Sequence, residues 1–165
     1  MNTSALTQFS RKSQRTLGDA YLKFQLCANA PAVISMRHAQ EALTLSARQL
    51  TPMPNMPSCM LGLMNRRSRV LWVVDLAQLL GLSMLGGGIQ QYNLIIVQVG
   101  SVPLGLAVQQ VEGITWLEAS SIQSPLRHVD PTVIPYLSGC VLQQQEIVLV
   151  LDATAVLNSP IFQSY

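Results

Sequence analysis

The side chains that could carry out chemistry are few in this chain, and they are scattered. The eight acidic residues are Asp19, Glu41, Asp75, Glu112, Glu118, Asp130, Glu146 and Asp152. No two of them share a spacing typical of general acid–base catalysis. The histidines and cysteines form no cluster at metal-ligand spacing, and no serine lies in a nucleophile-elbow motif. The sequence therefore predicts no enzymatic activity, no bound metal and no cofactor.

A basic cluster is the most distinctive group of charges. Arg66, Arg67 and Arg69 stand between two apolar stretches. We expect Arg66 and Arg69 to be solvated turn residues. Arg67 lies in a chain with few carboxylates, and Glu41 is a charged residue among apolar neighbours. We therefore predict a partly buried, bidentate ion pair between Glu41 and Arg67 on neighbouring strands.

The basic cluster belongs to a unit, Thr51–Gly81, that recurs later in the chain. The unit contains a proline-rich loop, two apolar strands around the basic turn, and a short helix for which Asp75 is a good N-cap. A shift of 77 residues places Gly62 on Gly139 and Asp75 on Asp152 without a gap. Two explanations are open. The chain holds two similar subdomains, or it uses a common strand–turn–strand–helix pattern twice.

Short apolar stretches separated by turn residues fill most of the remaining chain. Period-two alternation or continuous apolar runs predict strands at 21–26, 32–34, 92–99, 104–108 and 111–116. Amphipathic stretches long enough for a dozen-residue helix do not occur. The pattern favours a mainly β protein built from two small barrels rather than a doubly wound α/β sheet.

The sequence also predicts domain boundaries. Residues 1–18 are polar and basic, so we expect a disordered arm followed by a folded domain at 19–160. Three consecutive glycines at 86–88 are the best candidate for a joint between subdomains. We therefore expect a first barrel at about 32–90 and a second at about 91–150, with both chain ends contributing to the packing.

Composition limits the choice of partners. The chain is 49% hydrophobic and only 11% charged, so part of its apolar surface is expected to serve as a partner surface. A net charge of +2 without interleaved aromatic and basic residues argues against nucleic acid. No stretch is long and apolar enough for membrane insertion. Three cysteines, an odd number, and the lack of a secretory signal indicate a cytoplasmic protein.

Several motifs, taken in order, resemble the CheW-type adaptor domain of bacterial chemosensory systems. They are Gln40-Glu41, Pro54-Asn55-Met56-Pro57, Leu61-Gly62-Leu63-Met64-Asn65, Arg67, Val70–Leu76, Gly105–Val108, Val111-Glu112-Gly113, Tyr136–Gly139 and Val148–Asp152. The resemblance covers about residues 20–158. It implies a fold of two intertwined, five-stranded SH3-like β-barrels with short helices, packed around a shared core.

The resemblance also implies a function. Members of that family are non-catalytic adaptors that couple methyl-accepting chemoreceptors to the regulatory domain of a CheA-type histidine kinase. They thereby control chemotaxis, phototaxis or twitching motility, and they work in the cytoplasm at receptor arrays. The positions that match the family's polar kinase-binding or ion-pair residues are Glu41, Gly62, Asn65 and Arg67. The positions that match its receptor groove are Ala39, Leu94, Gly105, Val108 and Val111.

Two positions depart from the family pattern, and one alternative remains. Ser68 stands where a glycine is usual, and Trp72 stands where a proline is usual. Both departures bear on which partners this chain accepts. Because SH3-like barrels host many functions, the alternative is a generic peptide- or ligand-binding module unrelated to kinases. An aromatic content of 5% gives that alternative little to build a peptide groove with.

Overall fold

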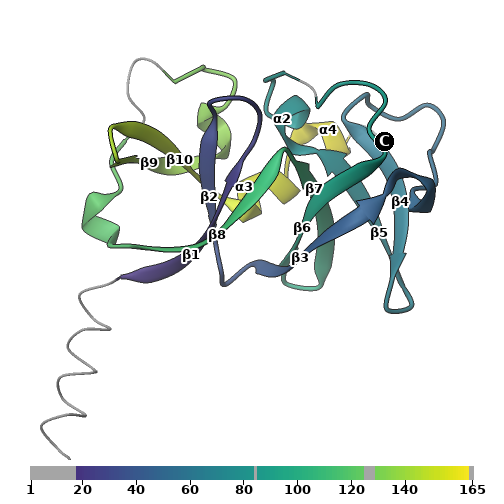
Figure 1. Cartoon of the computed structure of the whole chain (residues 1–165), viewed down its shortest axis with the longest axis horizontal. Helices are drawn as coiled ribbons and strands as arrows, with labels where there is room; N and C mark the ends of the chain where they lie inside the picture. Colours follow the sequence, from purple (N-terminus) through teal and green to yellow (C-terminus); the bar gives the residue numbers. More distant parts are fainter. Residues whose placement is uncertain (1–17, 84, 125–128, 164–165) are drawn as a thin grey trace, which may run out of the picture.

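The computed structural model describes residues 18–83, 85–124 and 129–163, so the predicted arm at 1–18 lies almost wholly outside the described residues. Two curled, five-stranded sheets stand side by side (Figure 1), which confirms the prediction of a mainly β protein with two barrels. The first barrel has the strand order β3–β6–β7–β5–β4 and the second has β8–β1–β2–β10–β9.

The strands of the first barrel are β3 (Ala39–Ser46), β4 (Met60–Arg66), β5 (Arg69–Asp75), β6 (Gln91–Val99) and β7 (Val102–Val108). The strands of the second barrel are β1 (Asp19–Gln25), β2 (Pro31–Ser35), β8 (Gln110–Leu117), β9 (Leu137–Gln143) and β10 (Glu146–Leu151). The helices are all short: η1 (Ala47–Gln49), α2 (Leu76–Leu79), η2 (Ala119–Ser121), η3 (Ile134–Tyr136), α3 (Ala153–Leu157) and α4 (Pro160–Gln163).

Hydrophobic patterning explains where each strand lies. The continuous apolar residues of β2 are buried on both faces because β2 is the central strand of its sheet, between β1 and β10. Along β8, by contrast, every second residue is exposed, so this edge strand keeps one wet face.

The repeat of the sequence is a repeat of the structure. The hairpin β4–β5 followed by α2 is matched by β9–β10 followed by α3. Both hairpins turn through two consecutive non-glycine residues with positive φ: Arg67 and Ser68 at +51° and +64°, and Gln144 and Gln145 at +48° and +66°. Positive φ at both central residues is the requirement of the type I′ turn, which suits the twist of a hairpin. Ser68 therefore adopts a conformation that glycine would reach without strain.

The capping aspartates are also confirmed. The Asp75 carboxylate accepts a hydrogen bond from the Gln78 amide at the start of α2. In the second barrel, the Asp152 carboxylate accepts hydrogen bonds from the amides of Thr154 and Ala155 at the start of α3. A carboxylate at this position satisfies backbone donors that the helix itself leaves free.

Each barrel closes by the same device. In the first barrel Thr51, just after β3 and η1, exchanges two backbone hydrogen bonds of 2.8 and 2.9 Å with Leu63 on β4. In the second barrel Gln123, after β8 and η2, exchanges two of 2.8 Å with Cys140 on β9. Each bridge joins the segment that follows one edge strand to the edge strand at the other side of the same sheet, which closes the sheet on itself.

The two barrels interlock rather than follow each other along the chain. The first barrel, β3 to β7, is contiguous, whereas the second takes β1 and β2 from before it and β8, β9 and β10 from after it. In matched order the second barrel reads β8, β9, β10, β1, β2, so it is a circular permutation of the first. The predicted boundaries at 32–90 and 91–150 are therefore wrong, because β2 and the β6–β7 hairpin each lie in the other barrel.

The glycine joint is corrected for the same reason. Gly86–Gly88 connects α2 to β6, and both of these belong to the first barrel. The chain passes between barrels instead at the turn after β2 and at Gln109, between β7 and β8. The Gln109 amide donates to the carbonyl of Gln25 at 2.9 Å, which ties the second crossing to β1.

Three clusters of buried side chains hold the fold. One fills the first barrel around Val73 and Leu94, and another fills the second around Val33 and Val148. The largest lies between the barrels, where Phe24 and Ile34 of the second pack with residues such as Leu106 of the first. Helix α3 of the second barrel also contacts β6 of the first. The shared core therefore packs the two barrels against each other.

Helices long and apolar enough to cross a membrane do not occur among the described residues.

Candidate functional site

Charged side chains meet at the mouth of the first barrel, where β3 and β4 come together. Glu41 on β3 accepts hydrogen bonds from Arg66 on β4 with both carboxylate oxygens: Arg66 Nε donates to Oε2 at 3.3 Å, and Arg66 Nη2 donates to Oε1. Arg67 Nη2 lies 3.8 Å from Glu41 Oε1. The predicted ion pair between Glu41 and Arg67 is present, but it is a single longer contact, and Arg66 makes the bidentate contact that was expected of Arg67.

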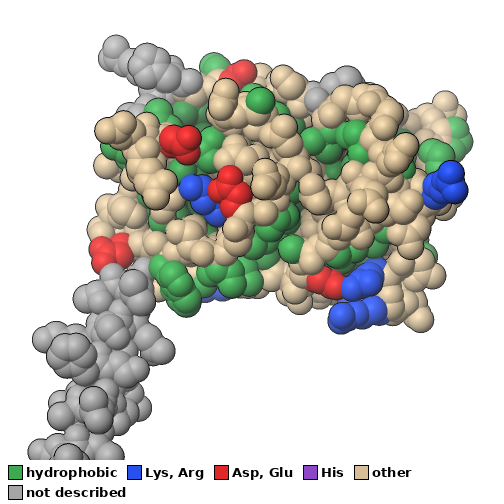
Figure 2. All heavy atoms as spheres, viewed as in Figure 1, with side chains coloured by type: hydrophobic (Ala, Val, Ile, Leu, Met, Phe, Trp, Pro, Cys, Tyr) green, Lys and Arg blue, Asp and Glu red, His purple; other side chains and the backbone are tan. Residues whose placement is uncertain are grey.

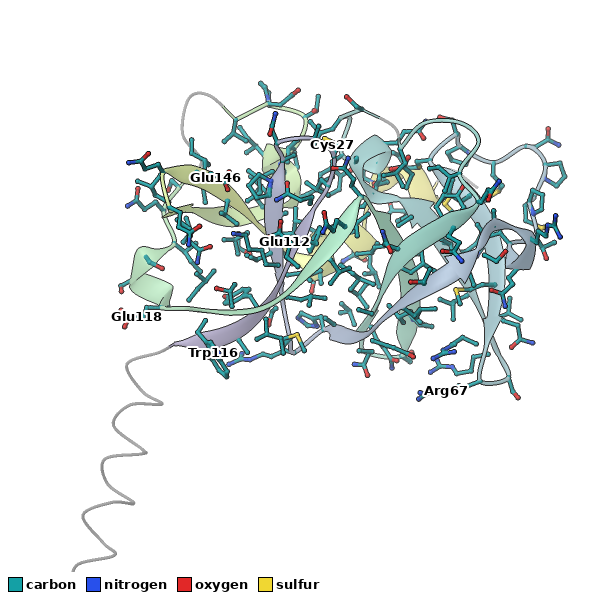
Figure 3. The ribbon with its side chains drawn as sticks, in the orientation of Figure 1. Cys27, Arg67, Glu112, Trp116, Glu118 and Glu146 are labelled. Atoms are coloured by element: carbon teal, nitrogen blue, oxygen red, sulfur yellow. The ribbon has the colours of Figure 1, made fainter. Side chains whose placement is uncertain are left out.

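Strand alternation explains the change of partner. Side chains of a strand point alternately to opposite faces, so Arg66 shares its face with the buried Met64. On β3, Glu41 shares its face with Leu45, which packs in the same barrel core. Arg67 falls in the turn, and its side chain is 78% exposed. Figure 3 shows it at the tip of the β4–β5 hairpin. This alternation was present in the sequence and is the signal that identifies Arg66.

The ion pair with Arg66 determines the charge state of the Glu41 carboxyl group. Hydrogen bonding from Arg66 lowers the pKa of Glu41 below its ordinary value, and the positive charges of Arg66 and Arg67 act in the same direction. The same bond raises the pKa of Arg66. Glu41 is therefore a carboxylate at neutral pH, and with Arg66 it forms an ion pair between β3 and β4 that we call the ionic clasp. Arg67 contacts the same carboxylate more loosely, and its side chain stays 78% exposed.

The other two predicted polar-site positions have separate roles. Gly62 has φ +144°, and a Cβ at this position would lie 2.5 Å from the Thr51 carbonyl oxygen. Only glycine permits the Thr51–Leu63 bridge beside it, so Gly62 is part of the barrel closure. Asn65 is exposed on β4 and lies opposite Val70, whose side chain is 64% exposed. Asn65 and Val70 therefore form outer surface next to the clasp.

The predicted receptor-groove residues are not gathered in one exposed groove. Ala39, Leu94, Gly105 and Val108 are buried, and Val111 is partly buried. Leu94 packs inside the first barrel, whereas Ala39, Val108 and Val111 belong to the core between the barrels. These positions are therefore core positions rather than a contact surface. Their contribution to receptor binding stays a prediction.

Exposed large apolar side chains are spread over both barrels, and two of them are neighbours on the outer face of β8. Ile114 and Trp116 are 59% and 53% exposed. Their cross-strand partners on β1 are Leu22 and Ala20, and Leu22 is part of the core between the barrels. Hydrophobic side chains gather along the lower margin of this half of the molecule (Figure 2), where Figure 3 places Trp116. We call Ile114 and Trp116 the β8 stripe. The sequence signal for it was the alternation along β8.

Groups suited to metal binding or thiol chemistry are not assembled. No group of three His, Cys, Asp or Glu side chains able to hold a metal occurs among the described residues. Burial raises the pKa of the Cys27 and Cys59 thiols, and the Asp75 charge adds to it. A raised pKa makes a thiol a poor nucleophile at neutral pH.

The fold defines a class of protein, a double β-barrel built from two interlocked five-stranded sheets. The family model of the CheW-like domain matches residues 20–160, and the chain belongs to that family. The crystal structure of the scaffolding protein TtCheW from Thermoanaerobacter tengcongensis is similar, with a TM-score of 0.73 at 18% identity, and the match covers 87% of this chain and 94% of that one. At this identity the likeness concerns the fold. No curated protein matches this chain.

Proposed function

We propose that this protein is a non-catalytic cytoplasmic adaptor that couples a chemoreceptor to the regulatory domain of a CheA-type histidine kinase. Membership of the CheW-like family supports an adaptor role. The observation that carries the proposal is the β8 stripe, because two large apolar side chains more than half exposed, one of them a tryptophan, are typical of a protein-binding surface.

The β8 stripe suits the apolar face of a receptor helix. Ile114 and Trp116 are two residues apart on one face of the strand and adjoin the core between the barrels through Leu22. A helix laid across this region would bury both side chains against a rigid base. Tryptophan is among the residues whose truncation most weakens an interface.

The ionic clasp suits the kinase. Arg67 presents a mostly exposed guanidinium beside Glu41, and Asn65 and Val70 add a polar and an apolar contact at the same barrel mouth. A planar guanidinium recognises a carboxylate with two hydrogen bonds, so an acidic residue on the kinase's regulatory domain is the expected partner.

The experiment is a binding titration against each partner. The purified protein is mixed with the regulatory domain of the histidine kinase of its own organism and, separately, with the cytoplasmic tip of a chemoreceptor. Trp116→Ala is expected to weaken receptor binding at least about tenfold and leave kinase binding intact. Arg67→Ala is expected to weaken kinase binding and leave receptor binding intact.

Matched controls are available on the same barrels. Leu142→Ala removes a side chain that is 72% exposed on β9 of the second barrel, and it should leave receptor binding unchanged. Arg48→Ala removes an exposed positive charge in η1 of the first barrel and should leave kinase binding unchanged. A correctly folded wild-type protein that binds neither partner would sink the proposal.

A further inference from the structure

A further cavity among the described residues is an apolar pocket beside the first barrel, and its lining includes neither the charged pair nor the β8 stripe. Its volume is about 430 Å³. It is lined by Met53, Met56, Pro57, Met60, Trp72, Val102, Pro103, Leu104, Leu157, Ile161 and Phe162. We propose that this pocket, here called the methionine pocket, binds the hydrocarbon chain of a small amphiphile such as a medium-chain fatty acid. The proposal does not depend on the proposed adaptor function.

Three segments far apart in sequence build its walls around Trp72 of β5. They are the proline-rich loop before β4, the tip of the β6–β7 hairpin, and the C-terminal helices α3 and α4. A pocket formed at such a junction has the size range of small-molecule sites, which is about 300–1,000 Å³. Trp72 contributes an indole to the lining of the pocket.

The lining selects the chemistry of the ligand. Every described residue that lines the pocket has an apolar side chain. Sites for polar metabolites carry a few converging polar groups, whereas the described lining has no charged, hydroxyl or amide side chain. Apolar cavities in proteins stay dry and bind hydrocarbons, as an engineered cavity of about 150 Å³ does with benzene. The polar end of an amphiphile would therefore remain at the mouth, where Met53 and Val102 are 42% and 57% exposed.

Three methionines make the walls adaptable. Met53, Met56 and Met60 are unbranched and have flexible, polarisable side chains, so they can follow the shape of a hydrocarbon chain. Met53 and Met56 come from the loop before β4, and Met60 is the first residue of β4. The loop also holds three prolines, Pro52, Pro54 and Pro57, which restrict its backbone. A restricted backbone with flexible side chains can hold a pocket open without fixing the exact shape of the ligand.

The second barrel provides an internal comparison. A pocket of about 260 Å³ lies at the equivalent place, formed by the tip of the β1–β2 hairpin, the loop before β9, strand β10 and the segment after α2. Its Leu149 corresponds to Trp72 by the 77-residue shift. Asn29 and Asp130 line it, so a hydrocarbon would have to displace water from polar groups. The repeat therefore offers two versions of one pocket, and only the version in the first barrel suits an apolar ligand.

The chain carries its own reporter for the test. It has two tryptophans, and Trp116→Phe leaves Trp72 as the only one. Bromine quenches indole fluorescence on contact, so 11-bromoundecanoic acid bound in the methionine pocket should quench Trp72 in a saturable way below its micelle concentration. Undecanoic acid and undecanol should both reverse the quenching. Reversal by the alcohol shows that the hydrocarbon chain, and not the carboxylate, is recognised.

A matched pair of variants locates the site. Ile161 on α4 lines the methionine pocket and Ile147 on β10 lines the equivalent pocket, and both are partly buried. Ile161→Gln should weaken binding at least tenfold, whereas Ile147→Gln should change it less than twofold. Circular dichroism identifies any variant that fails to fold. A second check does not need the fluorophore. The rise in melting temperature that undecanol causes is measured for Trp72→Leu, which changes the lining of the pocket.

Several outcomes would overturn the inference. The first is a lack of saturable quenching of Trp72. The second is a loss of binding in Ile147→Gln as large as that in Ile161→Gln. The third is saturable quenching of Trp116 in the Trp72→Phe variant. Loss of kinase or receptor binding by Ile161→Gln, without any quenching by the bromo acid, would assign the pocket to a partner protein and would also overturn it. Because the probes contain no kinase or receptor, failure here leaves the adaptor proposal standing.

Discussion

The two barrels have the same strand order, the same closing bridge, the same type of hairpin turn and the same capped helix, yet they differ at their mouths and pockets. Glu41 and Arg66 clasp the first barrel with charge, whereas at the corresponding seam of the second Gln143 Nε2 donates to Thr115 Oγ1 at 3.4 Å. The shared features provide the backbone hydrogen bonds and turns that a small closed sheet needs. The features that differ are side chains at the seam and in the pocket, where the backbone does not dictate the residue type, so these are the places where partners and ligands can be distinguished.

The core between the barrels joins them, and truncating a side chain in this core should lower the free energy of unfolding more than any other change considered below. Phe24 is fully buried between the barrels. Phe24→Ala is expected to lower the free energy of unfolding by about 3–5 kcal/mol, because it removes a large side chain and leaves a cavity. Trp72 reports on the first barrel and Trp116 on the second, so single-tryptophan proteins show whether the barrels unfold together. Urea transitions that coincide in wild type and variant are expected; separate midpoints would mean two independent domains.

The closing glycines should be equally sensitive in both barrels. A Cβ on Gly62 would lie 2.5 Å from the Thr51 carbonyl oxygen, and one on Gly139 would lie 2.4 Å from that of Gln123. Each alanine substitution is expected to cost about 3 kcal/mol, because both backbone strain and a steric clash oppose it. Gly87→Ala is the control, since a Cβ there meets nothing within 4 Å. A mild effect at only one of the two glycines would show that the barrels close differently.

The capping aspartates should be unequal. Asp75 is 3% exposed and also accepts the Leu85 amide at 2.9 Å, so it anchors the loop after α2 as well as the helix. Asp152 is partly exposed and caps α3 alone. Asp75→Ala is expected to cost about 2–3 kcal/mol and Asp152→Ala about 1 kcal/mol in chemical denaturation. Equal costs would mean that the loop contact contributes nothing.

Much of the fold could be predicted because it repeats local rules. Alternation in β8, the continuous apolar run of β2 and the caps at Asp75 and Asp152 are each visible in a few residues, and the structure has all of them. The circular permutation could not be predicted in the same way. A linear sequence shows which segments repeat but not which strands pair, since pairing depends on contacts between distant residues. Gly86–Gly88 therefore suggested a joint that the sheets do not have.

The site was predicted only in part, for two physical reasons. Arg66 was missed because a charged residue beside a turn resembles a solvated one, although alternation from Met64 places it on the inner face. The methionine pocket could not be predicted at all. Its walls come from three segments spread over about a hundred residues, and no local pattern indicates that such segments meet.

The smallest expected effect is a difference in pH dependence of stability between the Glu41–Arg66 contact of the first barrel and the Gln143–Thr115 contact of the second. The folded-state pKa of Glu41 is lowered, mainly by hydrogen bonding from Arg66. Its contribution to stability is therefore fully present above the unfolded-state pKa, about 4.3, and is lost as the pH falls through the lower folded-state value. Glu41→Gln should be less stable than wild type at pH 7 and equally stable at roughly pH 2 to 3. Salt should reduce the difference in stability at pH 7, because the ion pair is partly exposed. Thr115→Val removes the neutral contact of the other seam, so its small cost, measured by urea denaturation, should be the same at both pH values. A Glu41→Gln difference that persists in acid would mean that shape, and not charge, closes the first barrel.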